Sequence, residues 1–500
     1  MAKIKLTAKV DSEILVVGLG LANKKLQIES GAAQLDSAAL LATLNAMGAT
    51  AKADEVIKLP GKATKLVVFT GLGEIKSSYE PEVLRRAAGA AARHLNGNKN
   101  ATFSLPHKSV VELAAIAEGA ALGAYTFVEF LGSSKQEQKA PLELISLISK
   151  FSDTAQAKAA IKRAEILAEQ TYLVRDLINT PPSHLTPDSF SQKMKKLATK
   201  YGVKAEIIND ATLKKSGYGG IIGVGQGSAN PPRLLHVSYS PAKAKKRFAF
   251  VGKGITFDTG GLALKPANGM EAMKSDMSGA AAVIAAVFAI AQLKLPIAVD
   301  GWAPLAENMV SDNATRPSDV ITIYGGKTVE VLNPDAEGRL VLADALIKAA
   351  EVGKKAGGLD GIVDVATLTG AQVVALGTRT SAVMTNNEEF SNQFLKAAQL
   401  AGEAFWPMPL PVELRASLDS PVADIANIGD RMGGMLVAGL FLKEFIDPQT
   451  PWLHLDIAGP AFNEKKAHGY TPIGGTGIAL RSLITLAELA ASQSKTPTKS

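Results

Sequence analysis

Short, almost wholly apolar segments alternate with Ala-rich segments along the chain, and this alternation constrains the possible fold more than any other sequence feature. Residues 66–69, 248–251 and 361–367 are apolar runs without regular polar positions, which is typical of strands buried on both faces of a sheet. Residues 280–293 form an Ala-rich run of helical length. Because parallel strands need long crossover connections, the alternation predicts two α/β domains, the C-terminal one with a mixed, largely parallel sheet and helices on both faces.

A Pro-rich stretch at residues 180–187 separates two series of alternating segments. Proline prevents a helix from continuing, so a domain boundary is expected close to it. The chain has 500 residues, enough for more than one domain. We expect an N-terminal α/β domain over residues 1–165, a helical linker and boundary over residues 166–185, and a C-terminal α/β domain over residues 186–500.

Potential metal ligands are few in type. The chain has no Cys, which excludes disulfide frameworks, thiolate-bound zinc and thiol nucleophiles. Its six His residues are scattered and form no HExxH motif. A metal site in this chain must therefore depend mainly on carboxylates.

The net charge of +7 is spread evenly, with an excess of +4 before residue 185 and +3 after it. Two basic clusters, at residues 193–200 and 243–247, are most simply a solvated helix face and a polar turn. Nucleic-acid-binding proteins usually show a concentrated basic patch, so we do not expect nucleic acid as a partner. A DNA-binding regulator or scaffold is kept as the alternative function.

No targeting segment is expected. The apolar residues 14–22 directly follow Asp11 and Glu13, unlike the basic start of a signal peptide, and are predicted to begin with a strand. No apolar run approaches the length of about 18 residues that a membrane span requires. We therefore expect a cytoplasmic protein without a membrane partner.

Three glycine-rich motifs, at residues 18–20, 71–73 and 223–227, suggest a nucleotide site at first sight. They lack the third glycine, the downstream acid or the helix start that a dinucleotide site needs. We predict that all three are structural turns.

Four polar segments in the second half lie where predicted strands end or predicted helices begin, at residues 252–261, 264–266, 273–279 and 333–339. Such positions form the ligand crevice of open α/β sheets. The acidic residues expected to meet there are Asp258, Asp276, Asp335 and Glu337. Four carboxylates in one cleft repel each other, and two divalent cations about 3.5–4 Å apart would relieve that repulsion.

Lys253 could join these ligands as a neutral amine, because nearby dications disfavour its ammonium form. Asp335 and Glu337 are two residues apart, so on extended backbone their side chains would point the same way. Simpler interpretations remain: each acid could cap a helix, Lys253 could lie in a solvated loop, and Arg339 could pair with Glu337. We expect Ser278 to cap the helix at 280–293, which leaves Asp276 free of that role.

These motifs resemble those of the leucyl aminopeptidase, or cytosol aminopeptidase, family of dinuclear metallo-exopeptidases. The matching segments are residues 251–261, 264–266, 273–279, 333–340, 364–371 and 455–459. The resemblance covers essentially all of residues 172–485, whereas residues 1–165 resemble the family's N-terminal domain only in layout. Position 334 is Pro where the family signature usually has Thr.

The resemblance implies roles for individual residues. Lys253, Asp258, Asp276 and Glu337 would bind one metal ion, and Asp258, Asp335 and Glu337 the other. Lys265 and Arg339 would be catalytic. The pocket for the substrate would be lined by Met273, Thr367, Leu368, Gly370, Ala458 and Ala461.

The resemblance also implies a function. The C-terminal domain would be a peptidase that removes Leu and other medium apolar residues from peptides with a free N-terminus. Its cofactors would be two divalent ions per subunit, Mn²⁺ or Zn²⁺, with a bicarbonate held by Arg339. The family assembles as homohexamers, so the same assembly is expected.

Overall fold

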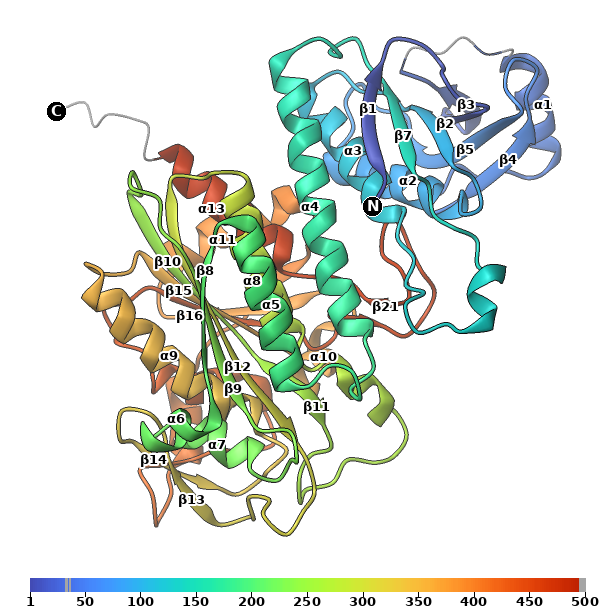
Figure 1. Cartoon of the computed structure of the whole chain (residues 1–500). Helices are drawn as coiled ribbons and strands as arrows, with labels where there is room; N and C mark the ends of the chain where they lie inside the picture. The colour runs from blue at the N-terminus through green and yellow to red at the C-terminus, as the bar shows by residue number, and fades with distance from the viewer. Residues whose placement is uncertain (32–34, 36, 494–500) are drawn as a thin grey trace. The chain divides into compact units, whose positions relative to one another are not determined.

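The structure is a computed structural model that describes residues 1–31, 35 and 37–493 (Figure 1). The chain divides into two compact units. The first unit consists of Met1–Tyr172 and Asn463–Ile473, and the second of Leu173–Phe462 and Gly474–Ser500. Each contains a mixed, largely parallel sheet with helices, which confirms the predicted fold class.

The sheet of the first unit has seven strands in the order β1-β7-β6-β2-β5-β4, with β3 paired to β2. Neighbours are parallel except for β3 and β4, which run antiparallel to β2 and β5. The elements of this unit are β1 Lys3–Thr7, β2 Ile14–Ala22, β3 Lys25–Glu29, α1 Ser37–Ala46, β4 Val56–Pro60, β5 Leu66–Glu74, α2 Pro81–His94, β6 Asn100–Ser104, α3 Val110–Gly123, η1 Ser133–Glu137 and β7 Leu144–Ile148. Helix α4, Ala155–Asn179, contains the division between the units.

A segment distant in sequence completes the core of the first unit. Residues 463–473 return to it, and Tyr470 is buried in its hydrophobic core. Tyr470 packs so closely on helix α2 that a Cβ added to Gly89 would lie 2.5 Å from the Tyr470 Cβ. Gly89 therefore has a steric role, because only glycine leaves room for this contact.

The sheet of the second unit has the order β17-β16-β19-β15-β10-β12-β9-β8, with β11 paired to β12. Strands β12, β10, β15 and β19 are parallel, whereas β9 and β16 run antiparallel to their neighbours β12 and β19. The strands are β8 Lys204–Ile208, β9 Arg233–Tyr239, β10 Lys246–Gly252, β11 Gly254–Asp258, β12 Ile297–Asn308, β15 Gly361–Ala366, β16 Ser381–Thr385, β17 Phe405–Pro407 and β19 Trp452–Asp456. Smaller sheets are formed by β13 Asp319–Thr322, β14 Thr328–Val331 and β18 Ile425–Ala426, and by β20 Phe462–Asn463 and β21 Gly474–Gly475.

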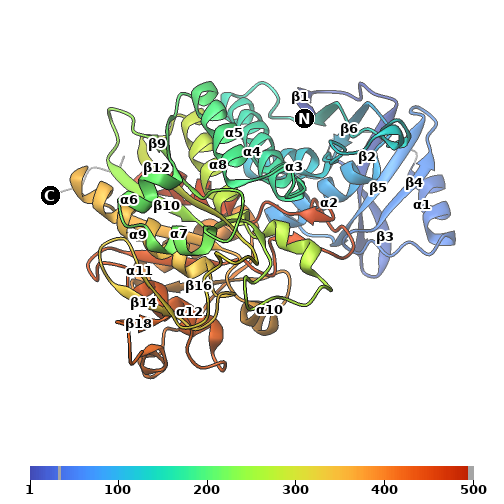
Figure 2. The same ribbon diagram turned by 60° about the horizontal axis from the view of Figure 1, so that its bottom comes forward.

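Helices cover both faces of this sheet. Helix α8 packs on β10, β12 and β15 and contacts α5 and α13, whereas α9 packs on the same strands and contacts α7 and α12. Figure 2 shows α5 and α8 on one side of the strands and α7 and α9 on the other. The helices are α5 Pro187–Tyr201, α6 Asp210–Lys215, α7 Gly219–Gly225, η2 Met270–Ser275, α8 Ser278–Gln292, α9 Gly338–Lys355, α10 Gly370–Leu376, α11 Glu388–Ala401, η3 Val412–Leu418, α12 Gly434–Lys443 and α13 Leu480–Gln493.

The expectation that no apolar run approaches membrane-spanning length is wrong: within the described residues, one apolar helical segment, Met270–Gln292, is long enough to cross a membrane by length and composition alone. Its most apolar window is 94% buried inside the protein, and every residue of α8 from Ser278 to Ala291 is buried. This burial is that of a core helix between a sheet and further helices.

The glycine motifs correct the sequence interpretation, because none of the three is a simple turn. Residues 18–20 and 71–73 lie within β2 and β5, where a Cβ on Gly71 would lie 1.9 Å from the Lys52 carbonyl oxygen. Residues 223–225 end helix α7 and residues 226–227 form the turn after it, where a Cβ on Gly227 would lie 2.7 Å from the Met309 carbonyl oxygen. Close backbone approach, which the sequence does not show, explains Gly71 and Gly227.

The first basic cluster lies on α5, whose residues Phe190, Met194 and Ala198 are buried. The lysines at 193, 195, 196 and 200 occupy its exposed face. This arrangement is the solvated helix face expected from the sequence.

Candidate metal centre

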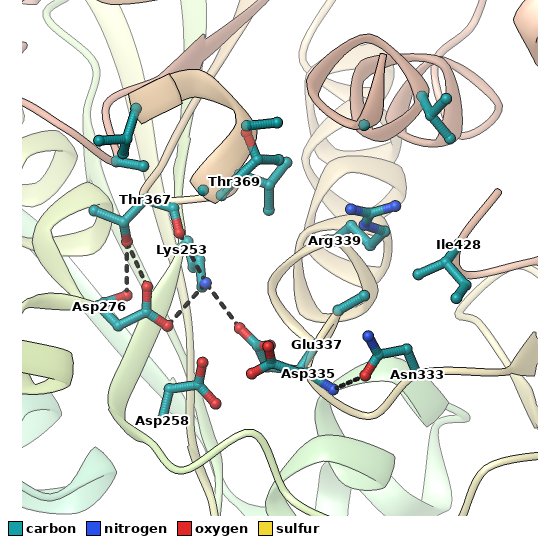
Figure 3. A pocket seen from close by; sticks show the side chains of 18 of the residues that line it. Lys253, Asp258, Asp276, Asn333, Asp335, Glu337, Arg339, Thr367, Thr369 and Ile428 are labelled. Atoms are coloured by element: carbon teal, nitrogen blue, oxygen red, sulfur yellow. Dashed lines mark hydrogen bonds and ion pairs between the residues drawn. The ribbon is translucent and has the colours of Figure 1, made fainter. Parts of the chain in front are cut away.

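The carboxyl ends of the parallel strands of the second sheet meet at one edge. Strand β10 is followed by Lys253, β15 by Thr367, and β12 ends at Asn308 beside Asp258 of β11. A cavity of about 560 Å³ opens at this edge (Figure 3). Its position is the one where open α/β sheets bind ligands.

The cavity collects residues that are far apart in sequence. Its walls contain seven residues predicted as metal ligands or catalytic groups: Lys253, Asp258, Lys265, Asp276, Asp335, Glu337 and Arg339. Five residues predicted for the substrate pocket also line it: Met273, Thr367, Leu368, Gly370 and Ala458. Ala461 is fully buried and does not line this cavity.

Lys253 is almost completely buried and faces three acceptors. Its Nζ lies 2.8 Å from Asp276 Oδ2 and 2.7 Å from Glu337 Oε1, and it donates to the Thr367 carbonyl at 3.0 Å (Figure 3). A Cβ on Gly338 would lie 2.5 Å from the Lys253 Cε, so the helix start leaves space for the lysine only because residue 338 is glycine. Lys253 is thus part of the site and not a solvated loop residue.

Asp258, Asp335 and Glu337 form the tightest acidic group. Each contributes a carboxylate oxygen, and these oxygens lie within 4.8 Å of one another. Lys265 pairs with Asp335 and, at 2.8 Å, with Asp258 Oδ2. Asp276 stands on the other side of Lys253, where its Oδ1 accepts from the Thr367 hydroxyl at 2.7 Å.

Three carboxyl groups of this site, those of Asp276, Asp335 and Glu337, have raised pKa values. Burial raises the pKa of Asp276, Asp335 and Glu337, and the nearby Asp258 charge raises all three further. Burial alone would lower the pKa of Lys253 and Lys265, but the surrounding carboxylates hold both above the usual value of 10.5. The site therefore has more carboxyl groups than its two lysines can neutralise, and this crowding disfavours ionisation of all four at once.

The donor set fits divalent metal ions. Among the residues that the structure describes, Glu337 Oε2 is a buried oxygen without a hydrogen-bond partner. A buried carboxylate oxygen normally has a partner, so an unpartnered one beside three other acids indicates a place for a cation. Carboxylate oxygens and an amine suit Mn²⁺, Mg²⁺ or Zn²⁺.

The loop before α9 brings Asp335 and Glu337 together differently from the extended backbone that the sequence suggested. Residues 334–335 form a turn, and Glu337 has helical dihedral angles at the N-cap of α9. The Asp335 amide donates to Asn333 Oδ1 at 2.8 Å, which closes this turn (Figure 3). A turn followed by a helix start, rather than strand periodicity, thus aligns the two acids.

Arg339 does not pair with Glu337, which was one of the simpler interpretations. Its Nη1 donates to the Asn427 carbonyl at 2.8 Å, and its guanidinium lies 5.9 Å from the centre of the Phe441 ring. Burial lowers the pKa of Arg339 to about 10, although the Glu337 and Asp456 charges oppose this. In the described part of the chain, Arg339 Nε has no hydrogen-bond partner.

The expected cap at Ser278 is also wrong. Helix α8 begins at Ser278 itself, its N-cap is Met277 without a side-chain cap, and the Ser278 hydroxyl donates to the Ser275 carbonyl. Asp276 nevertheless caps no helix N-terminus, because its carboxylate contacts Lys253 and Thr367.

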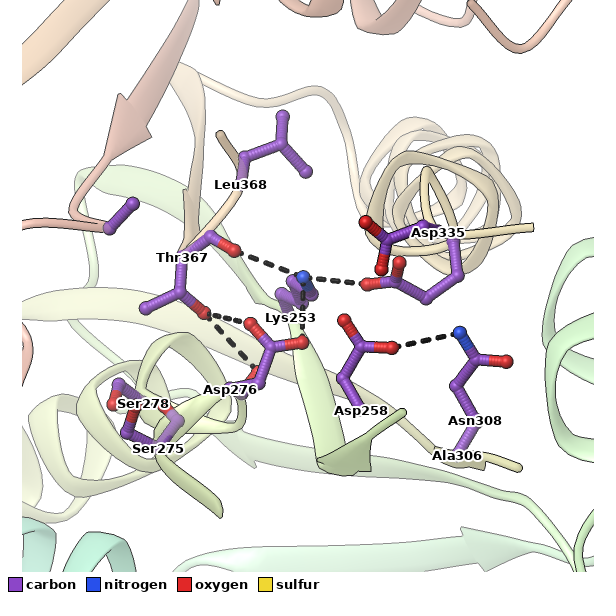
Figure 4. Close-up of polar contacts among 12 residues, drawn as sticks. Lys253, Asp258, Ser275, Asp276, Ser278, Ala306, Asn308, Asp335, Thr367 and Leu368 are labelled. Carbon is purple, nitrogen blue, oxygen red and sulfur yellow. Dashed lines mark hydrogen bonds and ion pairs between the residues drawn. The ribbon is translucent and has the colours of Figure 1, made fainter. Parts of the chain in front are cut away.

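The sequence did not reveal three buried residues that make hydrogen bonds to the loops and ligands of the site. Asn308 donates to Asp258 Oδ1 at 2.8 Å (Figure 4). The Asn427 side chain accepts from the Leu332 and Asn333 amides. Asp456 accepts from the Leu368 amide at 3.1 Å, the Thr369 hydroxyl at 2.7 Å and the Ala458 amide at 3.2 Å.

Comparison with known families finds two matches. Residues 172–484 match the model described as the catalytic domain of the cytosol aminopeptidase family, and residues 16–134 match the model of its N-terminal domain. A probable cytosol aminopeptidase of Streptomyces coelicolor is 50% identical over 502 residues and covers 96% of each chain. One of Micrococcus luteus is 46% identical, with 95% of each chain covered.

Solved structures are similar over nearly the whole chain. The bottromycin maturation enzyme BotP in complex with Mn has a TM-score of 0.85 at 36% identity, covering 96% of this chain and 100% of that chain. A mutant of tomato leucine aminopeptidase has a TM-score of 0.86 at 30% identity, covering 97% and 96%.

Proposed function

Because this chain belongs to the cytosol aminopeptidase family and is a leucyl aminopeptidase-type metallo-exopeptidase, we propose that it removes N-terminal Leu and other medium apolar residues from peptides. The observation that carries this proposal is the acidic group of Asp258, Asp335 and Glu337, which lies beside a substrate-sized cavity and contains an unpartnered carboxylate oxygen.

Two divalent ions fit this arrangement. Lys253, Asp258, Asp276 and Glu337 would hold one ion, and Asp258, Asp335 and Glu337 the other. When bound, such ions act as Lewis acids and lower the pKa of water towards neutrality. Mn²⁺ is a reasonable first choice, since it is present in the structure of the related BotP. The ions would compete with the Lys265 ammonium for Asp258 and Asp335, and the Lys253 ammonium would lose its proton to bind as an amine.

Lys265 is proposed to stabilise the oxyanion that develops when the peptide carbonyl is attacked. Its side chain is 22% exposed and reaches the cavity, whereas that of Lys253 is 4% exposed. The raised pKa keeps the Lys265 ammonium charged at neutral pH, so it can donate hydrogen bonds to negative oxygen. The Arg339 guanidinium, with a free Nε at the cavity wall, is proposed to hold an anion such as bicarbonate.

The substrate's first side chain would occupy the part of the cavity lined by Met273, Thr367, Gly370 and Ala458. Small residues leave space there, and a flexible Met adapts to apolar groups of different shape. A preference for Leu and similar residues follows, with Leu368 and Gly370 beside the substrate backbone. Ala461 would contribute only to the packing around this pocket.

Chelation tests the proposal directly. We expect the purified chain to release Leu from a Leu-containing dipeptide amide, to lose this activity after treatment with a chelator, and to regain it with Mn²⁺. The same peptide with an acetylated N-terminus is the control and should not be cleaved. Activity that persists in the metal-free protein, or cleavage of the acetylated peptide, would contradict the proposal.

Assembly and location are parts of the same proposal. A homohexamer is proposed from the family resemblance, and the relatives' name, cytosol aminopeptidase, supports a cytoplasmic location. Light scattering coupled to gel filtration would give about six times the chain mass of 52.2 kDa for a hexamer. A single-chain mass would refute that assembly.

A further inference from the structure

Asn308, the last residue of β12, is a buried amide that contacts two of the loops that carry proposed metal ligands. We infer that Asn308 is a positioning residue that sets the affinity of the metal ion shared by Asp258, Asp335 and Glu337. The inference rests on the proposed function, because it assumes that these residues bind metal. It concerns a residue that lies outside the proposed ligand set and outside the short segments on which the family resemblance is based.

The side-chain amide of Asn308 uses both of its hydrogens. Nδ2 donates to Asp258 Oδ1 at 2.8 Å (Figure 4). It also donates to the Pro334 carbonyl at 3.1 Å. An amide oxygen at this position would instead face two acceptors, so the contacts fix which way the amide points. Each N–H therefore holds one loop: the first holds Asp258, and the second holds the residue directly before Asp335.

The two carboxylate oxygens of Asp258 have different partners. Oδ1 accepts from Asn308 and also from the Gly260 amide at 2.9 Å. Oδ2 is left to face Lys265, 2.8 Å away, and the cavity. Hydrogen bonds to a charged acceptor are stronger than neutral ones, so they restrict rotation of the carboxylate and present one oxygen to a cation.

The contact to Pro334 fixes the second loop. Proline has no N–H, so its carbonyl is its only backbone hydrogen-bonding group, and Asn308 occupies it. Threonine, the usual family residue at this position, has the same carbonyl. The contact thus depends on a group that both residues share, and it explains how the loop tolerates proline beside a proposed ligand.

Two hydrogen bonds to the Asn308 carbonyl and a nearby glycine fix the position of Asn308. Its carbonyl accepts from the Thr259 amide at 3.0 Å and from the Thr259 hydroxyl at 2.8 Å. Gly261 has a φ of +59°, and a Cβ there would lie 2.8 Å from Asn308 Oδ1. The glycine is therefore required both by its backbone conformation and by the space that the Asn308 amide occupies.

Asn308 serves one side of the site more than the other. The Lys253 ammonium and the Asp276 carboxylate contact each other and Thr367, on the far side of Asp258 from Asn308 (Figure 4). Asp258 belongs to both proposed ligand sets, but Asp335, which follows Pro334, belongs to one of them. Loss of the Asn308 amide should therefore weaken the ion held by Asp258, Asp335 and Glu337 more than the ion beside Lys253 and Asp276. A general loss of stability would not discriminate between two sites so close together.

The test is the binding of Mn²⁺ to the metal-free, full-length chain, measured by equilibrium dialysis. Asn308→Ala and Asn308→Leu both remove the amide, and Leu, which branches at the same Cγ atom, fills the space that Ala would leave empty. The control is Asn386→Ala, which also removes two side-chain hydrogen bonds, to the Thr450 carbonyl and from the Trp452 amide, away from the cavity. Thermal melting shows whether the variants are folded.

We expect both the unaltered chain and Asn386→Ala to bind two Mn²⁺ ions per chain. Each ion should have the same affinity for the variant as for the unaltered chain. The Asn308 variants should bind the ion held by Asp258, Asp335 and Glu337 about 10–100-fold more weakly, which is the usual effect of losing a residue that orients a metal ligand. The other ion should be affected less. Unchanged binding in both Asn308 variants, or an equal weakening of both ions, would overturn the role of Asn308. An unaltered chain that binds no Mn²⁺ would overturn the proposed function itself.

Discussion

The two lysines of the site differ in what they can reach. Lys253 is enclosed by Asp276, Glu337 and the Thr367 carbonyl, so its three N–H donors already have partners. Lys265 has two carboxylate partners and faces the cavity with part of its side chain. Only Lys265 is therefore placed to donate to a substrate as well.

Lys265→Gln should lower kcat by about 10²–10³-fold, the usual effect of losing one donor to an oxyanion. KM should change little, because the lost interaction forms mainly as the oxyanion develops. Mn²⁺ should bind at least as tightly as before, since a cation beside Asp258 and Asp335 is removed. Steady-state kinetics with an aminoacyl-nitroanilide, together with dialysis of Mn²⁺, would measure both effects.

The surface substitution Lys196→Gln is the matched control, because Lys196 is exposed on α5. If Lys265→Gln lost Mn²⁺ as well as activity, Lys265 would be a support for the metal ligands rather than a donor to substrate.

Single residues of the site could be predicted from the sequence only where a motif carries them. The acids and lysines stand within short segments that end strands or precede helices, so their convergence followed from the topology of an α/β sheet. The contacts of Asn308 could not be predicted, because its partners lie 50 and 26 residues away in sequence. The partner of Arg339 was also unpredictable, since Asn427 is 88 residues distant.

At the scale of elements, an ionic cluster ties three strands of the second sheet together. Asp300 on β12 accepts from His236 of β9 at 2.9 Å and from Arg247 of β10 at 2.9 Å. Burial would raise the pKa of Asp300, but hydrogen bonds from His236 and Ser238 and the Arg247 charge lower it below 3.8. A carboxylate with a lowered pKa stabilises the folded protein above the pKa of the unfolded chain.

Asp300→Asn should therefore destabilise the second unit at pH 7, by about 1.5–3 kcal/mol for hydrogen bonds to a charged group. The stability that Asp300 contributes is lost as pH falls through its lowered pKa. The difference between the two proteins should thus persist from pH 7 to about pH 5 and shrink below about pH 4. Thermal melts of both proteins across this range measure it, and a difference that does not depend on pH would contradict the ionic explanation.

Helices and strands with a strong apolar pattern could be predicted closely. The run at 280–293 forms α8 over Ser278–Gln292, and the run at 248–251 forms the buried centre of β10. Helix α7 could not be predicted, because its glycine-rich sequence disfavours a helix in isolation. Its glycines instead permit close packing against α9, where Gly220 meets the backbone of Leu340.

At the scale of the whole molecule, the Trp residues report on one unit alone. The chain has three Trp residues, and Trp302, Trp406 and Trp452 all belong to the second unit. Trp302 and Trp452 are buried there, so unfolding of this unit exposes them to water. Trp fluorescence therefore follows the unit that contains the metal centre, whereas circular dichroism follows both units.

Mn²⁺ should raise the melting temperature measured by Trp fluorescence. An ion that binds only the folded state stabilises it by about 2.7 kcal/mol at a concentration 100 times its Kd. The chelated protein should melt earlier, because its crowded carboxylates then repel each other. A fluorescence transition that does not respond to Mn²⁺ would contradict binding of the metal to the second unit.

The sequence predicted two α/β domains but not that residues 463–473 belong to the first unit. Most of this segment is polar and carries no periodic pattern, so it looks like an ordinary loop. The segment belongs to the first core because Tyr470 is buried there and packs where Gly89 has no side chain. Gly89 and Tyr470 are 381 positions apart in the sequence. Such a pairing is set by tertiary packing and leaves no local signal.

This pairing limits how the chain can be recombined with its relatives. A chimera that takes only residues 1–172 from another protein keeps the native Tyr470 against a foreign helix α2. Any donor with a residue larger than glycine at the position of Gly89 would collide with the Tyr470 backbone, 2.7 Å from the added Cβ. The segment to exchange as one unit is therefore the N-terminal segment together with residues 463–473. Substitutions at position 89 and at position 470 are expected to depend on each other.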